Sequence, residues 1–163
     1  MSAVRDIMAT YRRPREVFGR WIGGEPDESR ALIVMMSACT VVFLSQWPVA
    51  ARQSFLTGND IAPQIGGSLM AWLFIAPLAL YGIAWISHLV ARLFGGNGNG
   101  FASRMALFWA LLAASPLWLL NGLVTGIMGA GFQAQLIGSL GLFAFVIFWA
   151  VGVKTAHFQR NKA

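Results

Sequence analysis

The placement of the acidic residues constrains the fold of this chain more than any other feature. Five of the six Asp and Glu residues lie within the first 28 positions of the 163-residue chain, and Asp60 is the one acid that follows. Charged residues make up 11% of the sequence and hydrophobic residues 57%, whereas soluble domains carry about 25% charged residues. Because a soluble domain of this composition could not cover its surface with polar groups, we predict an integral membrane protein.

Four apolar runs are each long enough to cross about 30 Å of hydrocarbon, which takes roughly 20 helical residues. They span about residues 31–50, 68–90, 103–127 and 136–153. Turn-forming residues separate the runs, in the segments 52–67, 95–98 and 128–135. We therefore predict an all-α, polytopic transmembrane helical bundle over residues 30–154, followed by a basic tail over residues 155–163.

Prolines mark three of the apolar runs. Pro48 stands near the end of the first run, where a helix-ending proline is expected, and Pro77 is expected to kink the second. Pro116 lies in the middle of the third run, and a split there would turn that run into a hairpin of two short helices. We prefer four spans, and five spans follow if the third run is split at Pro116.

Residues 1–29 form a polar N-terminal segment in which apolar residues recur at helical spacing. Val4, Met8 and Tyr11 lie among arginines, Pro14 interrupts the pattern, and apolar residues resume at Val17. Such a pattern is typical of an amphipathic helix that lies in the headgroup layer of a membrane. The candidate membrane-surface residues are Arg5, Arg12, Arg13, Arg15 and Trp21.

Basic residues lie at the ends of the apolar runs and predict the orientation. With four spans, eleven Lys and Arg residues fall on the side of the termini and the middle loop, and Arg52 alone falls on the other side. Since cytoplasmic loops are enriched in Lys and Arg, both termini are predicted to be cytoplasmic. The five-span alternative gives eight against four. This topology accounts for the net charge of +6, so nucleic acid is not expected as a partner.

Polar side chains within the spans are the default functional candidates, because they are costly in lipid. Ser115, Pro116 and Asn121 form the most informative cluster, since Pro116 frees a backbone carbonyl and Asn121 offers a donor and an acceptor to a neighbouring helix. Two interpretations stay open: a packing kink joined by an interhelical hydrogen bond, and a cavity for a lipid headgroup or small ligand.

The sequence contains no recognisable catalytic or metal-binding pattern. Cys39 is expected to be buried in a helix, His88 to form an interfacial or interhelical hydrogen bond, and His157 to lie in the solvated tail. The glycine-rich loop at 95–98 lacks the lysine of a nucleotide-binding loop. We therefore expect no cofactor, no metal and no enzymatic activity.

Small residues at four-residue spacing in the third run permit the close approach of another helix. The candidate helix-packing residues are Ala106, Ala110, Gly122 and Gly126. Their spacing does not tell whether the partner helix belongs to the same chain or to another copy.

Several short segments together resemble the bacterial branch of the Yip-one family, which has a Ypt-interacting-protein domain. They cover nearly the whole chain and are residues 13–18 (Arg-Pro-Arg-Glu-Val-Phe), 95–98 (Gly-Gly-Asn-Gly), 101–107 (Phe-Ala-Ser-Arg-Met-Ala-Leu), the Ser115-Pro116 pair and residues 154–157 (Lys-Thr-Ala-His). The resemblance implies a multispanning protein without known enzymatic chemistry, here in a bacterial inner membrane. Its eukaryotic relatives bind Rab-type GTPases and are described with five spans, so the four-span count departs from the family.

We therefore predict a non-enzymatic membrane organiser or adaptor that recruits protein partners or lipid through its N-terminal segment and middle loop. The expected partners are membrane lipid and other membrane proteins, or a second copy in a homo-oligomer. Two alternatives stay open. One is a small channel, transporter or lipid-handling bundle with a path past Pro116 and Asn121, and the other is an accessory subunit of a larger membrane complex, held by Gly122 and Gly126.

Overall fold

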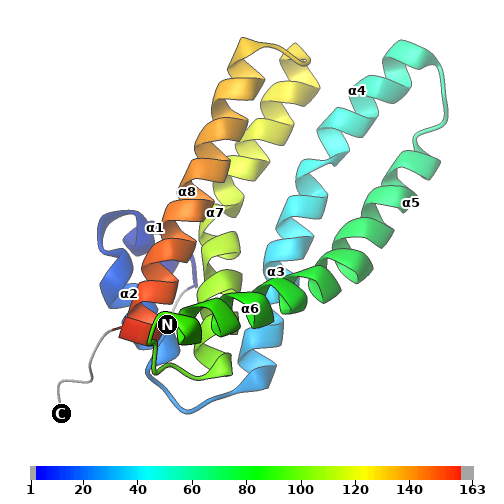
Figure 1. Ribbon diagram of the computed structural model, residues 1–163. Helices are drawn as coiled ribbons and strands as arrows, with labels where there is room; N and C mark the ends of the chain where they lie inside the picture. Colours follow the sequence, from blue (N-terminus) through cyan, green and yellow to red (C-terminus); the bar gives the residue numbers. More distant parts are fainter. Residues whose placement is uncertain (1–2, 159–163) are drawn as a thin grey trace.

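The computed structural model describes residues 3–158, and its regular elements over that range are helices (Figure 1). In chain order they are α1 (Ala3–Arg12), α2 (Pro14–Ile22), α3 (Glu28–Ser45), α4 (Trp47–Thr57), α5 (Ala62–Met70), the π-helical turn η1 (Ala71–Ile75), α6 (Ala76–Leu93), α7 (Gly100–Met128) and α8 (Phe132–Phe158). No strand occurs in this part of the chain. The prediction of an all-α helical bundle is confirmed.

Four helical stretches are long and apolar enough to cross a membrane. They are Glu28–Thr57, which joins α3 and α4, Ala62–Leu93, which joins α5, η1 and α6, and the single helices α7 and α8. The four predicted runs are thus found as helices. α7 continues without a break through Pro116, so the alternative in which the third run is split into two short helices is wrong.

The connection between the first two crossing stretches is shorter than predicted. The segment 52–67, predicted as a loop, is helical except for residues 58–61. Pro48 and Pro63 lie in the first turns of α4 and α5, and Gly58 ends α4 with a φ of 68°. A first helical turn does not need the N–H that proline lacks, and glycine adopts a positive φ without strain. The loop prediction was wrong because these residues mark helix boundaries rather than an irregular segment.

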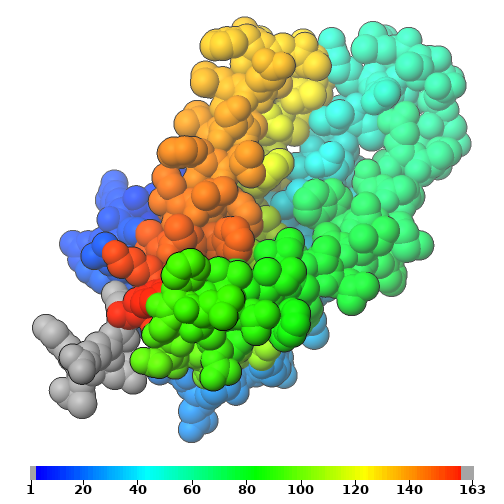
Figure 2. All heavy atoms as spheres, in the orientation of Figure 1, coloured from blue at the N-terminus to red at the C-terminus, as the bar shows by residue number. Residues whose placement is uncertain are grey.

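The second crossing stretch bends near Pro77. Pro77 lies in the first turn of α6, and the preceding turn, η1, is π-helical. Sharp bends of helices are found at prolines and at π-helical turns. Beyond the bend, α6 runs across the end of the bundle that carries the two termini, in front of α3 and toward the C-terminal end of α8 (Figures 1 and 2).

The length of this stretch agrees with its oblique course. Its 32 residues would extend about 48 Å as a straight helix at 1.5 Å per residue, whereas the hydrocarbon is about 30 Å thick. The stretch is therefore longer than a perpendicular crossing requires, and it ends beside the loop that leads into α7.

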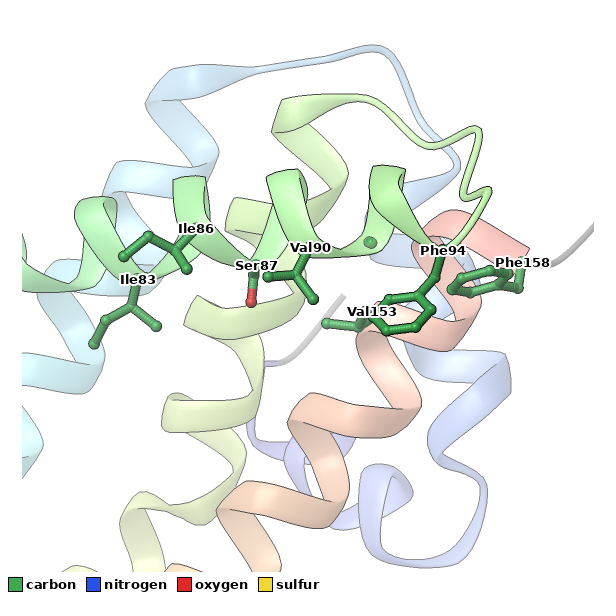
Figure 3. Close-up of a pocket in the computed structure, with 8 residues that line it drawn as sticks. Ile83, Ile86, Ser87, Val90, Phe94, Val153 and Phe158 are labelled. Atoms are coloured by element: carbon green, nitrogen blue, oxygen red, sulfur yellow. The ribbon is translucent and has the colours of Figure 1, made fainter.

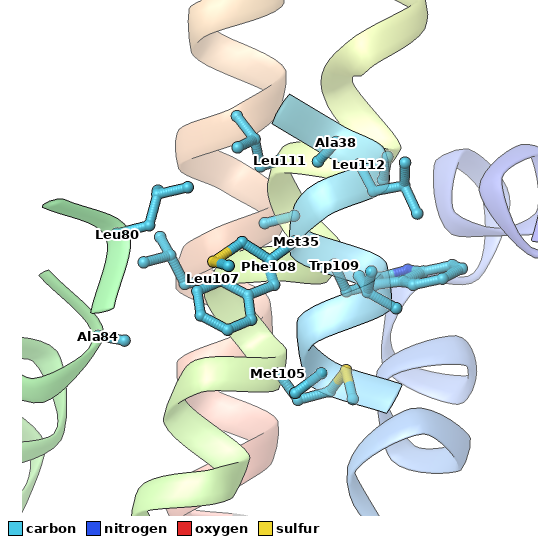
Figure 4. Close-up of a cluster of buried hydrophobic side chains, with 14 of the residues drawn as sticks. Met35, Ala38, Leu80, Ala84, Met105, Leu107, Phe108, Trp109, Leu111 and Leu112 are labelled. Atoms are coloured by element: carbon cyan, nitrogen blue, oxygen red, sulfur yellow. The ribbon is translucent and has the colours of Figure 1, made fainter. Parts of the chain in front are cut away.

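α7 is the centre of the bundle. It packs against α3, α4, α6 and α8, and it is the most buried of the four crossing stretches. Figure 4 shows Met35 and Ala38 of α3 and Leu80 and Ala84 of α6 around Phe108 of α7. In lipid, such van der Waals packing takes the place of the hydrophobic effect in joining helices.

Two glycines let α7 approach the junction of α3 and α4 until the backbones touch. A Cβ atom at Gly122 would collide with the carbonyl oxygen of Ser45, and one at Gly126 would collide with Pro48. Nearer the N-terminus of α7, the candidate packing residues Ala106 and Ala110 are fully buried. The small residues of α7 therefore make their contacts within this chain.

The Gly122→Ala variant is expected to be destabilised by about 1–3 kcal/mol, because the new methyl group must push α7 away from Ser45. Gly82→Ala is the matched control. It makes the same change inside α6, where nothing lies within 4 Å of the new Cβ, and the higher helix propensity of alanine should raise stability slightly. Thermal unfolding in detergent compares the two variants, and an equal Tm for both would contradict the backbone contact.

Candidate functional site

Ser115 satisfies the carbonyl that Pro116 leaves free in α7. Pro116 has no N–H to donate to the carbonyl oxygen of Leu112, one turn earlier. The Ser115 hydroxyl donates a hydrogen bond to that oxygen at 2.8 Å, and Ser115 is buried. The Ser115 hydroxyl is therefore used to stabilise the helix itself.

Asn121 makes a different contact, with α8. Its Oδ1 atom would stand 3.4 Å from a Cβ placed on Gly138 of α8, so the amide packs against the α8 backbone. Among the described residues, this buried oxygen has no hydrogen-bond partner. The expected interhelical hydrogen bond to Oδ1 is therefore not found, and Ser115 and Asn121 serve separate contacts.

The N-terminal hairpin, which we define as α1 and α2 (residues 3–22), is joined by an ion pair between its two helices. Pro14 lies in the first turn of α2 and separates the two helices. Arg20 of α2 donates to the carboxylate of Asp6 on α1 at 2.9 Å, and Asp6 is buried. This ion pair holds the two short helices against each other.

The apolar side of α2 is turned toward the bundle. Val17 and Phe18 are almost fully buried where α2 packs against α7 and α8. Gly152 of α8 makes room for Phe18, whose ring carbon would lie 2.8 Å from a Cβ at that position. The apolar face of α2 therefore meets α7 and α8.

Hydrogen bonds join α1 to the middle of α7. The indole N–H of Trp109 donates to the Thr10 hydroxyl at 3.1 Å, and the Tyr11 hydroxyl donates to the carbonyl oxygen of Ala113 at 2.9 Å. Trp21 of α2 stacks on the Trp109 ring, with 4.3 Å between the ring centroids. Burial raises the pKa of Tyr11, so its phenol stays protonated and able to donate at neutral pH.

Thr10 and Trp109 were not predicted to be partners. One signal was available, since a tryptophan inside an apolar run needs an acceptor for its N–H. The acceptor lies 99 residues away in the sequence, and no local pattern names it.

The outer face of α1 combines apolar and basic side chains. Val4 is 65% exposed and Met8 is 69% exposed, although both are apolar. Trp21, a candidate membrane-surface residue, is half-buried where it stacks on Trp109. The four candidate arginines of the hairpin are exposed, and they are Arg5, Arg12, Arg13 and Arg15.

A second polar cluster lies where α6, α7 and α8 meet. The Ser103 hydroxyl is 2.6 Å from Nε2 of His157 and 3.4 Å from Nδ1 of His88. Gly96 and Gly98 of the glycine-rich loop pack so closely on His157 that a Cβ at either position would lie within 3 Å of it. His157 is 5% exposed, so the prediction of a solvated histidine is wrong. The cluster joins the loop to the end of α8.

The basic tail predicted over residues 155–163 begins inside a helix. α8 continues to Phe158 and buries Thr155 as well as His157. Residues 159–163 lie outside the described part of the chain. Within residues 3–158, no group of three or more His, Cys, Asp and Glu side chains could hold a metal ion.

The Thr10→Val variant is expected to loosen the N-terminal hairpin, because it leaves the buried Trp109 N–H without an acceptor at a cost of about 1–3 kcal/mol. Hydrogen–deuterium exchange of residues 3–22 should then become faster than in the wild type. Thr40→Val is the control, since Thr40 is exposed and bonds only the Met36 carbonyl of its own helix. Unchanged exchange in Thr10→Val would show that this hydrogen bond does not hold the hairpin.

Comparison with known proteins agrees with this architecture. The Yip1 domain matches residues 8–163, which include most of the N-terminal hairpin and all four crossing stretches. Neither the curated proteins nor the solved structures gave a match. The match extends over nearly the whole chain and confirms the resemblance that the sequence motifs indicated. The chain therefore belongs to the Yip1 domain family.

Proposed function

We propose that this membrane protein is a non-enzymatic organiser or adaptor whose N-terminal hairpin recruits protein partners or anionic lipid. The observation that carries the proposal is the two-sided character of α1. Thr10 holds one side of it to α7, and the side turned away from Thr10 exposes Val4 and Met8 among arginines. A fixed surface that is both basic and apolar suits binding at the interface between membrane and water.

The distribution of basic residues supports a cytoplasmic location for both termini, in a bacterial inner membrane. Arg92, Arg104 and Lys154 lie on the turns of α6, α7 and α8 that share one end of the bundle with the hairpin (Figure 1). Lys and Arg residues are enriched on the cytoplasmic side of membrane proteins. The hairpin would then face cytoplasmic partners and the anionic lipid of the inner leaflet.

The basic residue at the other end has a structural role that accounts for its presence. Arg52 of α4 donates to the carbonyl oxygen of Ile127 at 2.8 Å and to that of Gly126 at 3.4 Å. These carbonyls belong to the last turn of α7, where a cation is favoured. Arg52 therefore does not weaken the orientation argument.

The two alternative functions have less support. The glycine face proposed to hold an accessory subunit is already occupied by Ser45 and Pro48 of the same chain. A channel or transporter path past Pro116 would use Asn121, which instead packs against Gly138. The first observation counts against the accessory subunit, and the second counts against a conducting bundle.

A fluorophore on α1 tests lipid binding in the full-length protein. With Cys39→Ser, a polarity-sensitive dye on Met8→Cys is expected to shift to the blue in nanodiscs of anionic phospholipid relative to phosphatidylcholine, because the arginines draw α1 onto anionic headgroups. The same dye on Glu16→Cys, an exposed position of α2, is expected to show no difference. An equal Met8 signal in the two lipids would remove lipid binding from the proposal.

Protein recruitment is tested by affinity capture of the tagged full-length chain from its native membranes. The double variant Arg5→Gln/Arg12→Gln is expected to lose a stoichiometric protein partner that the wild type retains. Arg92→Gln, which removes an exposed basic residue outside the hairpin, should retain it. A partner that both variants retain would bind elsewhere, and recruitment by the hairpin would be rejected.

A further inference from the structure

Two histidines from different helices meet at one serine, beside the glycine-rich loop. The Ser103 hydroxyl of α7 is 2.6 Å from Nε2 of His157 on α8 and 3.4 Å from Nδ1 of His88 on α6. The centroids of the two imidazole rings are 5.4 Å apart. Ser103 is fully buried, and His157 is almost so. We call these three residues the histidine cluster, and its rings are close enough for a charge on one to act on the other.

The contacts of His157 determine where its proton lies when the ring is neutral. A neutral imidazole has one N–H and one acceptor nitrogen. Nδ1 of His157 is buried and has no hydrogen-bond partner among the described residues, and a Cβ at Gly98 would lie 2.7 Å from it. An N–H at this position would be unsatisfied, so we assign the proton to Nε2. Nε2 then donates to the Ser103 oxygen, and the serine hydroxyl is free to donate to Nδ1 of His88.

A second proton on His157 does not fit this arrangement. Both nitrogens of a charged imidazole are donors, so the new N–H would lie against Gly98, where the described residues offer it no acceptor. Burial of an unpaired donor and burial of a charge both cost free energy. The packed cluster therefore favours the neutral form of His157, whereas a ring in contact with water is free to bind the proton.

Among the described residues, no acid is placed to neutralise a charge on His157. Helices α2, α6 and α7 pack against α8, and α3 packs against α6 and α7. The carboxylates in these helices are those of Glu16 and Glu28, which pair with Arg13 and Arg104. Neither α8 nor the loop between α6 and α7 contains an acid over this range. The other charged groups of the five helices are cations, and they are Arg15, Arg20, Arg30, Arg92 and Lys154.

His157 also holds the glycine-rich loop in place. The backbone N–H of Asn97 donates to the carbonyl oxygen of His157 at 3.2 Å. Gly96 is buried, and a Cβ there would lie 2.9 Å from the Cβ of His157. Next along the chain, Phe94 and Phe158 line one apolar groove where the ends of α6 and α8 meet (Figure 3). Displacement of the His157 ring would therefore release the loop from the end of α8.

We propose that the histidine cluster is a pH-sensitive latch, which holds the glycine-rich loop on the end of α8 near neutral pH and releases it when His157 is protonated. An imidazole in water takes up a proton near about pH 6.5. The released form binds this proton and the latched form does not. The latched form is therefore fully favoured above that pH and loses stability as the pH falls below it. The latch contains no residue of the N-terminal hairpin, so it does not depend on the proposed recruiting function.

Hydrogen–deuterium exchange of the full-length protein in detergent tests the latch. Exchange is followed at about pH 7.5 and about pH 5.5, on either side of the ordinary imidazole value, and each rate is divided by the intrinsic rate at that pH. The corrected exchange of residues 95–100 is expected to be several-fold faster at the lower pH, with a ceiling of about tenfold for one proton. Residues 129–131, which connect α7 to α8 and contain no titratable side chain, should show equal corrected exchange at both pH values.

Two neutral replacements separate the roles of the histidines. In His157→Gln the side-chain amide can still donate to Ser103 but takes up no proton, so the corrected exchange of residues 95–100 is expected to be the same at both pH values. In His88→Asn the amide oxygen replaces the Nδ1 acceptor, and the pH response is expected to persist. Circular dichroism and monodispersity in detergent show whether each variant is folded.

The His88→Asn variant also allows a direct measurement, because His157 is then the one histidine of the chain. Nitrogen-15 NMR of this variant with labelled histidine is expected to show the proton on Nε2 near neutral pH. Three results would overturn the proposal. They are a neutral His157 with its proton on Nδ1, equal corrected exchange of the wild-type loop at both pH values, and a pH response in folded His157→Gln that equals that of the wild type.

Discussion

The lack of hydrogen-bonding partners in hydrocarbon is the constraint on which the rest of the structure depends. A backbone carbonyl without a donor is costly in lipid, and side chains donate to carbonyls of α7 at three places. Ser115 donates to the carbonyl freed by Pro116, Tyr11 donates to the carbonyl of Ala113, and Arg52 donates to carbonyls of the last turn. Two of these donors come from α1 and α4, so the bonds that complete α7 also fix its neighbours in place.

Close backbone approach is the second consequence of an apolar solvent. Since lipid tails compete with aliphatic side chains for contact, helices gain most where small residues let backbones touch. Gly122 brings α7 onto the junction of α3 and α4, and Gly152 accepts the ring of Phe18 from the hairpin. Gly98 brings the glycine-rich loop onto the end of α8. The hairpin and the loop are therefore parts of one packed body with the crossing helices.

Much of the fold could be predicted from the sequence, because a crossing helix is a continuous local pattern of apolar residues. Helix boundaries were harder to predict. Pro48 and Pro63 interrupt an apolar pattern in the same way whether they end a helix or begin one. The contacts of the candidate site were the hardest to predict. The contact between Trp109 and Thr10 depends on how two distant segments fold together, and so does the approach of His88 to His157.

The central claim is that the chain after residue 30 crosses the bilayer four times, and thiol labelling tests it most directly. Single cysteines in a Cys39→Ser background are exposed to a membrane-impermeant reagent on one side of sealed vesicles. Glu25→Cys, before α3, and Asn97→Cys, between α6 and α7, are predicted to react from the same side, and Asn59→Cys, between α4 and α5, from the opposite side. Reaction of Asn59→Cys and Asn97→Cys from one side would contradict the four-helix crossing.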